Sequence, residues 1–457
     1  MKRIAIIGGG ISGLTAAYEL ELARKRGADI DWHLYEASNR LGGVIETTRY
    51  STPEGEFILE GGPDGWVSEK PWARELSIEL GLGSELIYSN DATRKTYILI
   101  DGKLQPIPDR MRMMVPEDLT ALDNSLLFSE SAKKAYANEL TRADELKAQA
   151  PTHDESVANF VQRHFGDEVL DTLAAPLLSG VFGGDVHKLS VRAVMPQFVA
   201  MEREHGSLIA ALQSRTQRHT QVAQSIFTSL RRGVGSLTEA VIAMLPPERL
   251  HLECKVACSL NDKFDRTIVA TSLDGTRSLL TTTSPKAAEL LPTDASSAIL
   301  AAFVWTGDLA RSFAIPAGFG FLVPQGSANE QQLLACTFVD QKFPHRAPEG
   351  ARVMRAFFGG RSAESLSSQS DGEVAKIALE QLRGILGSIP EPSFHTVRYW
   401  PRSLPQYEVG HLERIAALER LVQQVPGLHL LGNSYRGVGI PDLIRDARVT
   451  ARAIADR

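Results

Sequence analysis

The chain has 457 residues, of which 43% are hydrophobic and 23% charged, and its formal net charge is −6. This length and composition predict two or three packed domains of an ordinary globular protein. The acidic balance argues against a nucleic-acid partner, and three cysteines are too few for a disulfide framework or a four-ligand zinc site, so we expect reduced thiols in a cytoplasmic protein.

The first predicted elements are a strand, a glycine-rich turn, a helix and a second strand. Residues 4–7 form a short apolar run closed by glycines, and Leu14, Ala17 and Tyr18 follow at helical spacing. An alternating segment then ends at Glu36. This order indicates the opening βαβ unit of a dinucleotide-binding fold.

Gly8, Gly10 and Gly13 stand in this turn with the spacing G-x-G-x-x-G. The first glycine permits a tight turn, the second lets the backbone approach a pyrophosphate, and the third lets helix and strand pack closely. The pyrophosphate is then expected at the helix N-terminus, with Ser12 as a further candidate contact. Glu36 is placed to accept hydrogen bonds from ribose hydroxyls. An ordinary turn is the alternative, but the strand, helix and acidic residue in register favour a dinucleotide.

The middle of the chain, from about residue 116 to 212, shows helical periodicity in place of strand-like alternation. One helix is predicted to begin at Asp154 and to end at Gly166. Its predicted apolar stripe is Val157, Phe160, Val161 and Phe165. We interpret this region as a helical subdomain.

Residues 110–114 combine two arginines with three methionines, Met111, Met113 and Met114. This composition is compatible with a patch at a membrane interface. The alternative is an apolar loop packed on its own domain. No apolar run approaches the roughly 18 residues of a membrane span, so any membrane contact is expected to be peripheral.

Strands return after residue 233 and alternate with helices to the end of the chain. The predicted elements are helices over 237–245 and 373–386, strands within 250–259, 266–272 and 428–431, and a closing helix. The cofactor domain is therefore expected to be discontinuous, with parts from the start, the middle and the end of the chain.

Residues 40–43 read RLGG and resemble the R-x-G-G extension of flavoprotein oxidases of the amine-oxidase superfamily. Arg40 near a diphosphate, with Gly42 and Gly43 admitting the flavin end, would suit FAD. An exposed arginine in a loop is the alternative. Residues 60–64, EGGPD, resemble the second flavin-side loop of that superfamily. Its candidate contacts are Gly61, Gly62 and Pro63.

Three later segments narrow the resemblance from the amine-oxidase superfamily to one family within it. Residues 175–185 read APLLSGVFGGD, residues 399–411 read YWPRSLPQYEVGH, and residues 431–442 read LGNSYRGVGIPD. Together they resemble the protoporphyrinogen and coproporphyrinogen oxidases of the bacterial oxygen-dependent type, and the resemblance spans essentially the whole chain.

The resemblance implies an α/β fold with three units. These are a discontinuous Rossmann-like FAD-binding domain (1–66, 225–295 and 412–457), an α+β substrate-binding domain (67–110 and 296–411) and a helical, membrane-associating candidate subdomain (111–224).

The resemblance also implies noncovalent FAD, because a covalent flavin would need a cysteine near residues 395–440 and the sequence has none there. The start of the closing helix would offer N–H groups to the side of the flavin ring that becomes negative on reduction. Val256, placed in mid-strand, would contact the adenine side through its backbone. A helix-capping loop and a core valine are the alternatives. The implied contacts at the flavin ring are Gly432, Asn433, Gly439, Ile440 and Pro441.

For the substrate, the resemblance places Gly180 at a tetrapyrrole, with its carbonyl accepting from pyrrole N–H groups. Leu322 and Phe338 resemble residues that line a slot, and Lys70 resembles a residue that meets a propionate. Ordinary core packing is the alternative for the two apolar residues. A solvated surface lysine is the alternative for Lys70.

The implied function is an oxygen-dependent enzyme of haem biosynthesis that removes six electrons from coproporphyrinogen III and releases hydrogen peroxide, with protoporphyrinogen IX as the alternative substrate. Residues 62–70, GPDGWVSEK, most resemble enzymes whose route passes through coproporphyrin. Plant-type enzymes place an arginine near Thr96, which this chain lacks there, although Arg94 and Lys95 are close.

The flavin carries the hard chemistry, so the sequence nominates no catalytic side chain and no metal ligands. The expected partners are a porphyrinogen, molecular oxygen and a ferrochelatase that receives the product, and the oligomeric state is open. A flavin amine oxidase and a non-catalytic porphyrin-binding flavoprotein are the rival functions.

Overall fold

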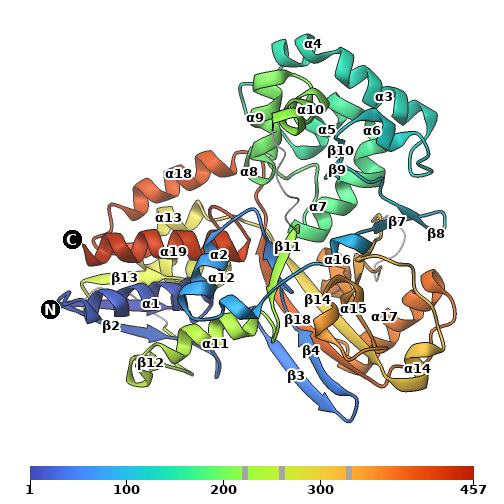
Figure 1. Ribbon diagram of the computed structural model, residues 1–457. Helices are drawn as coiled ribbons and strands as arrows, with labels where there is room; N and C mark the ends of the chain where they lie inside the picture. Colours follow the sequence, from blue (N-terminus) through green and yellow to red (C-terminus); the bar gives the residue numbers. More distant parts are fainter. Residues whose placement is uncertain (219–224, 257–262, 326–331, 457) are drawn as a thin grey trace.

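The computed structural model describes residues 1–218, 225–256, 263–325 and 332–456, which form two large sheets and a layer of helices (Figure 1). In Figure 1 the parallel sheet with both chain termini lies at the left, the larger mixed sheet at the lower right, and the helical layer at the top. Within these residues, no helix has the length and apolar character needed to cross a membrane.

The parallel sheet has five strands in the order β12-β2-β1-β13-β19. Ile6 and Ile268 pack into the core beneath α1, α2, α11 and α19, whereas Ile7 and Val269 pack into a second core with α12, α13 and α18. Helices therefore cover both faces, which explains why the first strand is a continuous apolar run. The strands are β1 (Lys2–Ile7), β2 (Ile30–Tyr35), β12 (Leu250–His251), β13 (Arg266–Val269) and β19 (Leu428–Leu430). The helices are α1 (Ile11–Lys25), α2 (Trp72–Glu79), α11 (Gly235–Ala243), α12 (Leu273–Thr283), α13 (Pro285–Glu289), α18 (His411–Val422) and α19 (Ile440–Ala455).

This sheet takes strands from the start, the middle and the end of the chain, which confirms the predicted discontinuous Rossmann-like arrangement. The predicted mid-strand position of Val256 was wrong, because β12 ends at His251 and Val256 lies in irregular backbone, while its contact with the adenine side stays a prediction. Residues 257–259 of the predicted strand lie outside the described residues.

The second sheet has seven strands in the order β18-β14-β17-β16-β15-β7-β8, and only the β15–β7 pair is parallel. Helix α17 (Asp371–Leu386) packs on this sheet through Val374, Ala378 and Leu382, and Ser370 with Glu373 forms a capping box at its start. The strands are β7 (Thr96–Ile100), β8 (Lys103–Pro106), β14 (Ala295–Trp305), β15 (Gly320–Leu322), β16 (Ala335–Phe338), β17 (Arg352–Gly359) and β18 (Phe394–Pro405). Short helices follow β14, β16 and β17, namely α14 (Gly307–Arg311), α15 (Val339–Lys342) and α16 (Gly360–Ser365).

Three small β-structures connect these sheets to each other and to the helical layer. They are the hairpin of β3 (Thr47–Thr52) with β4 (Gly55–Glu60), the sheet of β5 (Trp66–Val67), β11 (Phe227–Leu230) and β6 (Leu86–Tyr88), and the pair β9 (Met111–Arg112) with β10 (Val115–Pro116).

The helical layer buries the predicted apolar stripe of α5 (Val157–Phe165) in its core. The helix begins at Val157, three residues after the predicted start at Asp154, because Ser156 caps it by accepting a hydrogen bond from Asn159 N. It ends at Gly166, whose φ of +83° favours glycine. The other helices of the layer are α3 (Glu130–Thr141), α4 (Ala143–Ala148), α6 (Asp167–Val169), α7 (Ala175–Phe182), α8 (Val191–Val194), α9 (Pro196–His205) and α10 (Leu208–Arg218).

A buried histidine links three of these helices. The ring of His164 on α5 lies 3.0 Å from Glu139 Oε1 on α3 and 3.2 Å from Glu202 Oε1 on α9. Burial by itself would lower the pKa of His164, but the hydrogen bonds to the two carboxylates outweigh it and raise that pKa. The layer is therefore held by charged groups as well as by apolar packing.

The three methionines of residues 110–114 point inward. Met114 is fully buried, and Met111 and Met113 pack against the core of the helical layer. The flanking Arg110 pairs with Asp118 at 2.6 Å, and Arg112 donates to Gln197 at 2.8 Å. The methionines therefore serve the core, as in the alternative interpretation, and do not form an exposed membrane patch.

Candidate cofactor and substrate site

The carboxyl edge of the parallel sheet gathers the predicted cofactor segments. Gly8 follows the end of β1, Glu36 follows β2, Ala270 follows β13, and Gly432 lies two residues after β19. Open α/β sheets bind their ligands outside the carboxyl ends of the strands. The topology therefore brings together segments that are more than 400 residues apart in the chain.

The three glycines of the turn have different surroundings. A Cβ atom at Gly13 would lie 1.9 Å from Gly8 O, and one at Gly8 would lie 2.5 Å from Ala270 O. A Cβ atom at Gly10 would meet nothing within 4 Å, and no side chain caps α1 at this position. Gly8 and Gly13 are thus needed for packing, while Gly10 leaves the cradle at the helix N-terminus that a pyrophosphate requires.

Glu36 fastens this turn to the end of β2. Its Oε2 accepts from Gly9 N at 2.7 Å, and its Oε1 accepts from the backbone N and the hydroxyl of Ser38, both at 2.8 Å. Two carboxylate oxygens offer about four acceptor positions, so one remains for a ribose hydroxyl.

Arg40 holds the shape of its own loop. Its guanidinium donates to Gly43 O at 2.5 Å, lies 3.3 Å from a carboxylate oxygen of Glu46, and lies over the ring of Trp400 at 5.8 Å. The loop also contacts the glycine turn, because Gly42 N donates to Gly9 O at 2.8 Å. The two predicted cofactor loops are therefore side by side, and contact of Arg40 with the diphosphate remains a prediction.

The segment 61–64 packs against that loop. A Cβ atom at Gly62 would lie 1.9 Å from Val44 O, so only glycine fits. Gly61 donates from its N to Glu46 O at 2.7 Å, and Gly61 O accepts from Trp400 Nε1 at 2.7 Å. Both predicted flavin-side loops are therefore joined by backbone contacts.

Asp64, at the end of this segment, lies among buried cations. Its carboxylate pairs with Lys342 at 3.0 Å and with Arg355 at 3.4 Å. Burial alone would raise the pKa of Asp64, but the attraction of Lys342 and Arg355 outweighs it and lowers that pKa to about 2. Arg355 also donates to Gly62 O. Lys342 and Arg355 therefore bind the segment 61–64 through the carboxylate of Asp64 and the carbonyl of Gly62.

The segment 432–439 leads into the N-terminus of α19. Gly432 has a φ of +127°, and Asn433 Nδ2 donates to Ser403 O at 2.8 Å. No side chain caps the helix at Gly439, and Ile440 and Pro441 begin its first turn. An uncapped helix start with free N–H groups suits the negative side of a reduced flavin ring.

Two of the four predicted substrate residues lie together. A Cβ atom at Gly180 on α7 would lie 3.3 Å from Leu322 Cδ2 on β15, so these residues face each other between the helical layer and the mixed sheet. Phe338 is fully buried and packs edge-on against Phe321 at 6.1 Å, as in the core-packing alternative. Lys70 pairs with the first turn of α19, where its Nζ lies 2.5 Å from Asp442 Oδ2.

A family model for flavin containing amine oxidoreductases matches residues 11–455 of the chain. The chain belongs to this family. It is 33% identical to coproporphyrinogen III oxidase of Bacillus subtilis (strain 168), over 97% of this chain and 96% of the relative.

Two further similarities agree with this assignment. The flavoprotein is 28% identical to a chloroplastic protoporphyrinogen oxidase of Oryza sativa subsp. japonica, over 99% of this chain and 88% of the relative. The crystal structure of a protein named as a protoporphyrinogen oxidase from Exiguobacterium sp. 255-15 superposes with a TM-score of 0.84 at 32% identity, covering 99% of this chain and 98% of that chain. The protein is therefore an FAD-dependent oxidoreductase, grouped with the porphyrinogen oxidases.

Several residues that shape the site of this flavoprotein were missed by the sequence analysis. Arg355 and Lys342 come from β17 and α15 and carry no local motif, so the sequence offered no signal for them. Trp400 and Tyr407 stand within the segment 399–411, which served only to identify the family. The available signal was that Trp400 and Tyr407, whose side chains can donate hydrogen bonds, lie within this segment.

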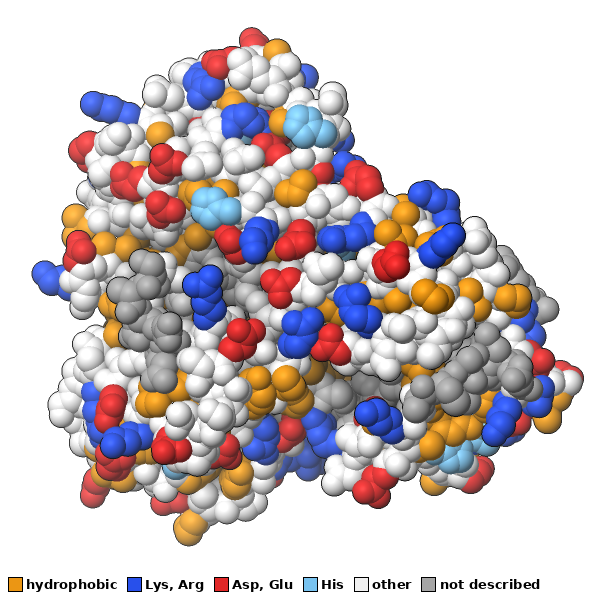
Figure 2. Space-filling view, turned by 180° about the vertical axis from the view of Figure 1, so that it is seen from behind, with side chains coloured by type: hydrophobic (Ala, Val, Ile, Leu, Met, Phe, Trp, Pro, Cys, Tyr) orange, Lys and Arg blue, Asp and Glu red, His pale blue; other side chains and the backbone are white. Residues whose placement is uncertain are grey.

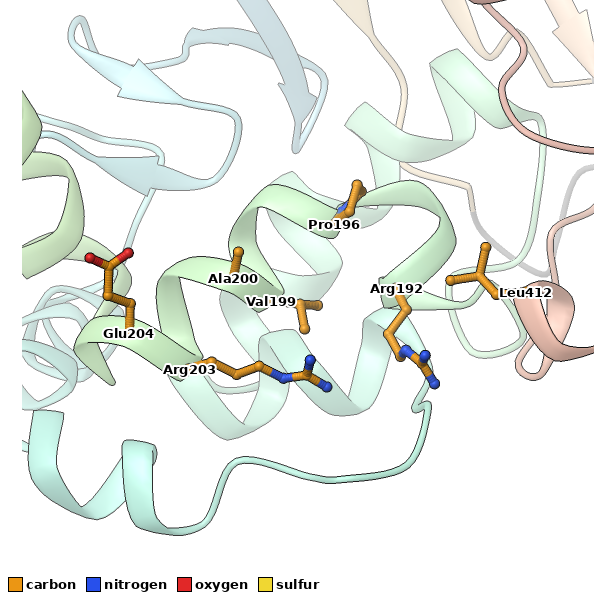
Figure 3. A pocket seen from close by; sticks show the side chains of 7 residues that line it. All are labelled: Arg192, Pro196, Val199, Ala200, Arg203, Glu204 and Leu412. Carbon is orange, nitrogen blue, oxygen red and sulfur yellow. The ribbon is translucent and has the colours of Figure 1, made fainter. Parts of the chain in front are cut away.

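A hollow of about 520 Å³ lies elsewhere on the flavoprotein, between α9 and the start of α18 (Figure 3). None of the predicted cofactor or substrate residues lines it, and one of its arginines, Arg192, pairs with Glu413 at 2.6 Å. On the face shown in Figure 2, acidic and basic side chains of the described residues are interspersed, without the single-sign patch typical of nucleic-acid binding. The residues that line the hollow between α9 and α18 are Arg192, Pro196, Val199, Ala200, Arg203, Glu204 and Leu412.

Proposed function

We propose that this flavoprotein oxidises coproporphyrinogen III to coproporphyrin III, with molecular oxygen as the electron acceptor and hydrogen peroxide as the second product. The observation that carries the proposal is the 33% identity to a coproporphyrinogen III oxidase over 97% of the chain. The convergence of the predicted FAD segments at one sheet edge supports it, because an oxidase of this family needs its cofactor and substrate surfaces side by side.

Noncovalently bound FAD would supply the hydride-transfer and oxygen-reducing chemistry at this site. The chain's own residues bind and orient. Gly10 and the first turn of α1 would hold the pyrophosphate, and the start of α19 would face the ring. The pair Gly180 and Leu322 would border the tetrapyrrole, with the Gly180 carbonyl accepting from pyrrole N–H groups.

Lys70 is proposed to meet a propionate at the mouth of the slot. Its side chain is 42% exposed, so its ammonium can contact solvent and substrate while it remains paired with Asp442. A macrocycle with carboxylates at its edge is expected to need an apolar slot with basic groups at the entrance. Arg94 and Lys95 are exposed at the start of β7 and are the alternative basic groups. The product would then pass to an enzyme that inserts a metal into porphyrins.

A comparison of kcat/KM for coproporphyrinogen III and protoporphyrinogen IX tests the substrate assignment. We expect the higher value for coproporphyrinogen III, because it carries four propionates where the other carries two. For Lys70→Ala we expect a loss of less than about fivefold for coproporphyrinogen III, because an exposed ion pair contributes only about 0.2–1 kcal/mol.

The exposed Lys103 on β8 is a matched control, and Lys103→Ala should leave both values unchanged. Higher kcat/KM for protoporphyrinogen IX would contradict the assignment. An unchanged ratio of the two values in Lys70→Ala would remove Lys70 from the substrate site.

A further inference from the structure

One short stretch of the chain contacts all three loops that border the flavin end of the site. We call it the frame segment, residues 398–411, and it comprises the last part of β18, a connection and the first residue of α18. Arg398 Nε donates to Glu46 Oε1 at 2.5 Å, and Trp400 Nε1 donates to Gly61 O at 2.7 Å. The backbone of Ser403 accepts from Asn433 at 2.8 Å.

Tyr407 contributes two hydrogen bonds and one ring contact. Its hydroxyl donates to Asn433 O at 2.7 Å and accepts from Gly437 N at 3.0 Å, so one oxygen spans the segment 433–437 just before α19. The side chain is 2% exposed, and its ring stacks on His411 at 3.9 Å. Burial raises the pKa of Tyr407, so the hydroxyl keeps its proton and both hydrogen bonds at neutral pH.

His411, the first residue of α18, hydrogen-bonds to the same segment 433–437. Burial lowers the pKa of His411 to about 4, so its ring is neutral at pH 7. A neutral ring that faces the carbonyl of Tyr435 at 2.8 Å must carry its proton on Nε2 and donate it. Two side chains, stacked on each other, therefore bind three successive parts of this loop.

The frame segment is itself anchored to the helical layer. Ser190 N donates to Tyr407 O at 2.7 Å, and Val409 N donates to Lys188 O at 2.9 Å. These backbone bonds leave the segment little freedom to follow a loop that moves. Its side chains therefore act as fixed donors for the loops that they hold.

We propose that Trp400 and Tyr407 are positioning residues for FAD, which hold the segments 61–64 and 432–437 at the spacing that the bound flavin requires. The structural reason is that each segment contains two glycines, whose backbone is little restricted by side chains, and that a side chain of the frame segment hydrogen-bonds directly to its backbone. The proposal concerns cofactor binding, so it holds whichever porphyrinogen is the substrate.

The test is a titration of apoprotein with FAD for Tyr407→Phe and Trp400→Phe, together with visible circular dichroism of the bound flavin. Each change removes one hydrogen-bonding group and keeps an aromatic ring. We expect the FAD Kd to rise about tenfold for Tyr407→Phe, because two partly buried backbone groups lose their partner. We expect a smaller rise for Trp400→Phe, and an altered flavin dichroism for both.

Two matched controls separate positioning from stability. Tyr136 is fully buried and donates to Met114 O at 2.9 Å, and the buried Trp305 donates from Nε1 to Pro390 O at 3.0 Å, both away from the flavin loops. Tyr136→Phe and Trp305→Phe should lower the melting temperature of the apoprotein but leave the FAD Kd and the dichroism unchanged.

The proposal is overturned if the site variants bind FAD within twofold of their matched controls and show the wild-type dichroism, whatever their melting temperatures. If Tyr407→Phe does not yield folded protein, the comparison of Trp400→Phe with Trp305→Phe decides the question by itself, because Trp400 is only partly buried and its replacement is tolerable.

Discussion

Gly10→Val is expected to abolish FAD binding while the apoprotein stays folded. A Cβ atom at Gly10 meets no protein atom within 4 Å, so valine does not clash with the chain itself. Its branched side chain would instead occupy the space at the N-terminus of α1 where the pyrophosphate is expected. The measurement is the flavin content of the purified protein and a titration of the apoprotein with FAD.

Two comparisons sharpen this prediction. Gly384 lies on the exposed side of α17 and also has no neighbour within 4 Å of a Cβ atom, so Gly384→Val should retain full FAD content. Gly13→Val should unfold the unit formed by β1, α1 and β2, because a Cβ atom at this position would lie 1.9 Å from Gly8 O. Normal flavin content in Gly10→Val would show that the turn does not hold the pyrophosphate.

Asp64→Asn is expected to lower the free energy of unfolding by roughly 3–5 kcal/mol, the cost of breaking a buried charge network. The substitution keeps the shape of the side chain but removes the anion that faces Lys342 and Arg355. Glu60, which pairs with Arg346 at 2.7 Å, would then face three buried cations, Lys342, Arg346 and Arg355. Chemical denaturation of wild type and variant at pH 7 measures the difference.

The pH dependence of this difference has a defined sign. The pKa of Asp64 is lowered to about 2 in the folded protein, against about 3.9 for an unfolded aspartate. Its contribution is therefore present above pH 4 and is lost as the pH falls towards 2. Asp308, fully exposed and paired with Arg311, is the control, and Asp308→Asn should change stability by no more than about 0.5 kcal/mol. An Asp64→Asn protein as stable as the control would contradict the account of the network.

The parts of the site that could be predicted from sequence are those with a local physical requirement. Gly8 and Gly13 were assigned from spacing, and the structure shows the backbone contacts that exclude a side chain at both. The stripe of α5 was predictable because its 3.6-residue period reflects one buried face. Such requirements involve residues that are close together in the sequence, so a local pattern reveals them.

Other features depend on contacts between distant segments. Lys342 and Arg355 reach Asp64 from almost 300 residues away, and neither carries a pattern of its own. Val256 was misplaced because β12 stops at His251, which an alternating sequence does not reveal. For the methionines of residues 110–114 the sequence left both a membrane patch and a packed loop open, since it does not show that the helical layer folds over them.

The most direct test of the account is a single-turnover experiment with the purified flavoprotein and coproporphyrinogen III. Without oxygen, we expect the substrate to bleach the visible absorption of the bound flavin, because hydride passes from the macrocycle to FAD. On admission of oxygen, we expect the flavin absorption to return, coproporphyrin fluorescence to appear, and three peroxide molecules to form per porphyrin. A flavin that stays oxidised in the presence of coproporphyrinogen III and of protoporphyrinogen IX would contradict the account.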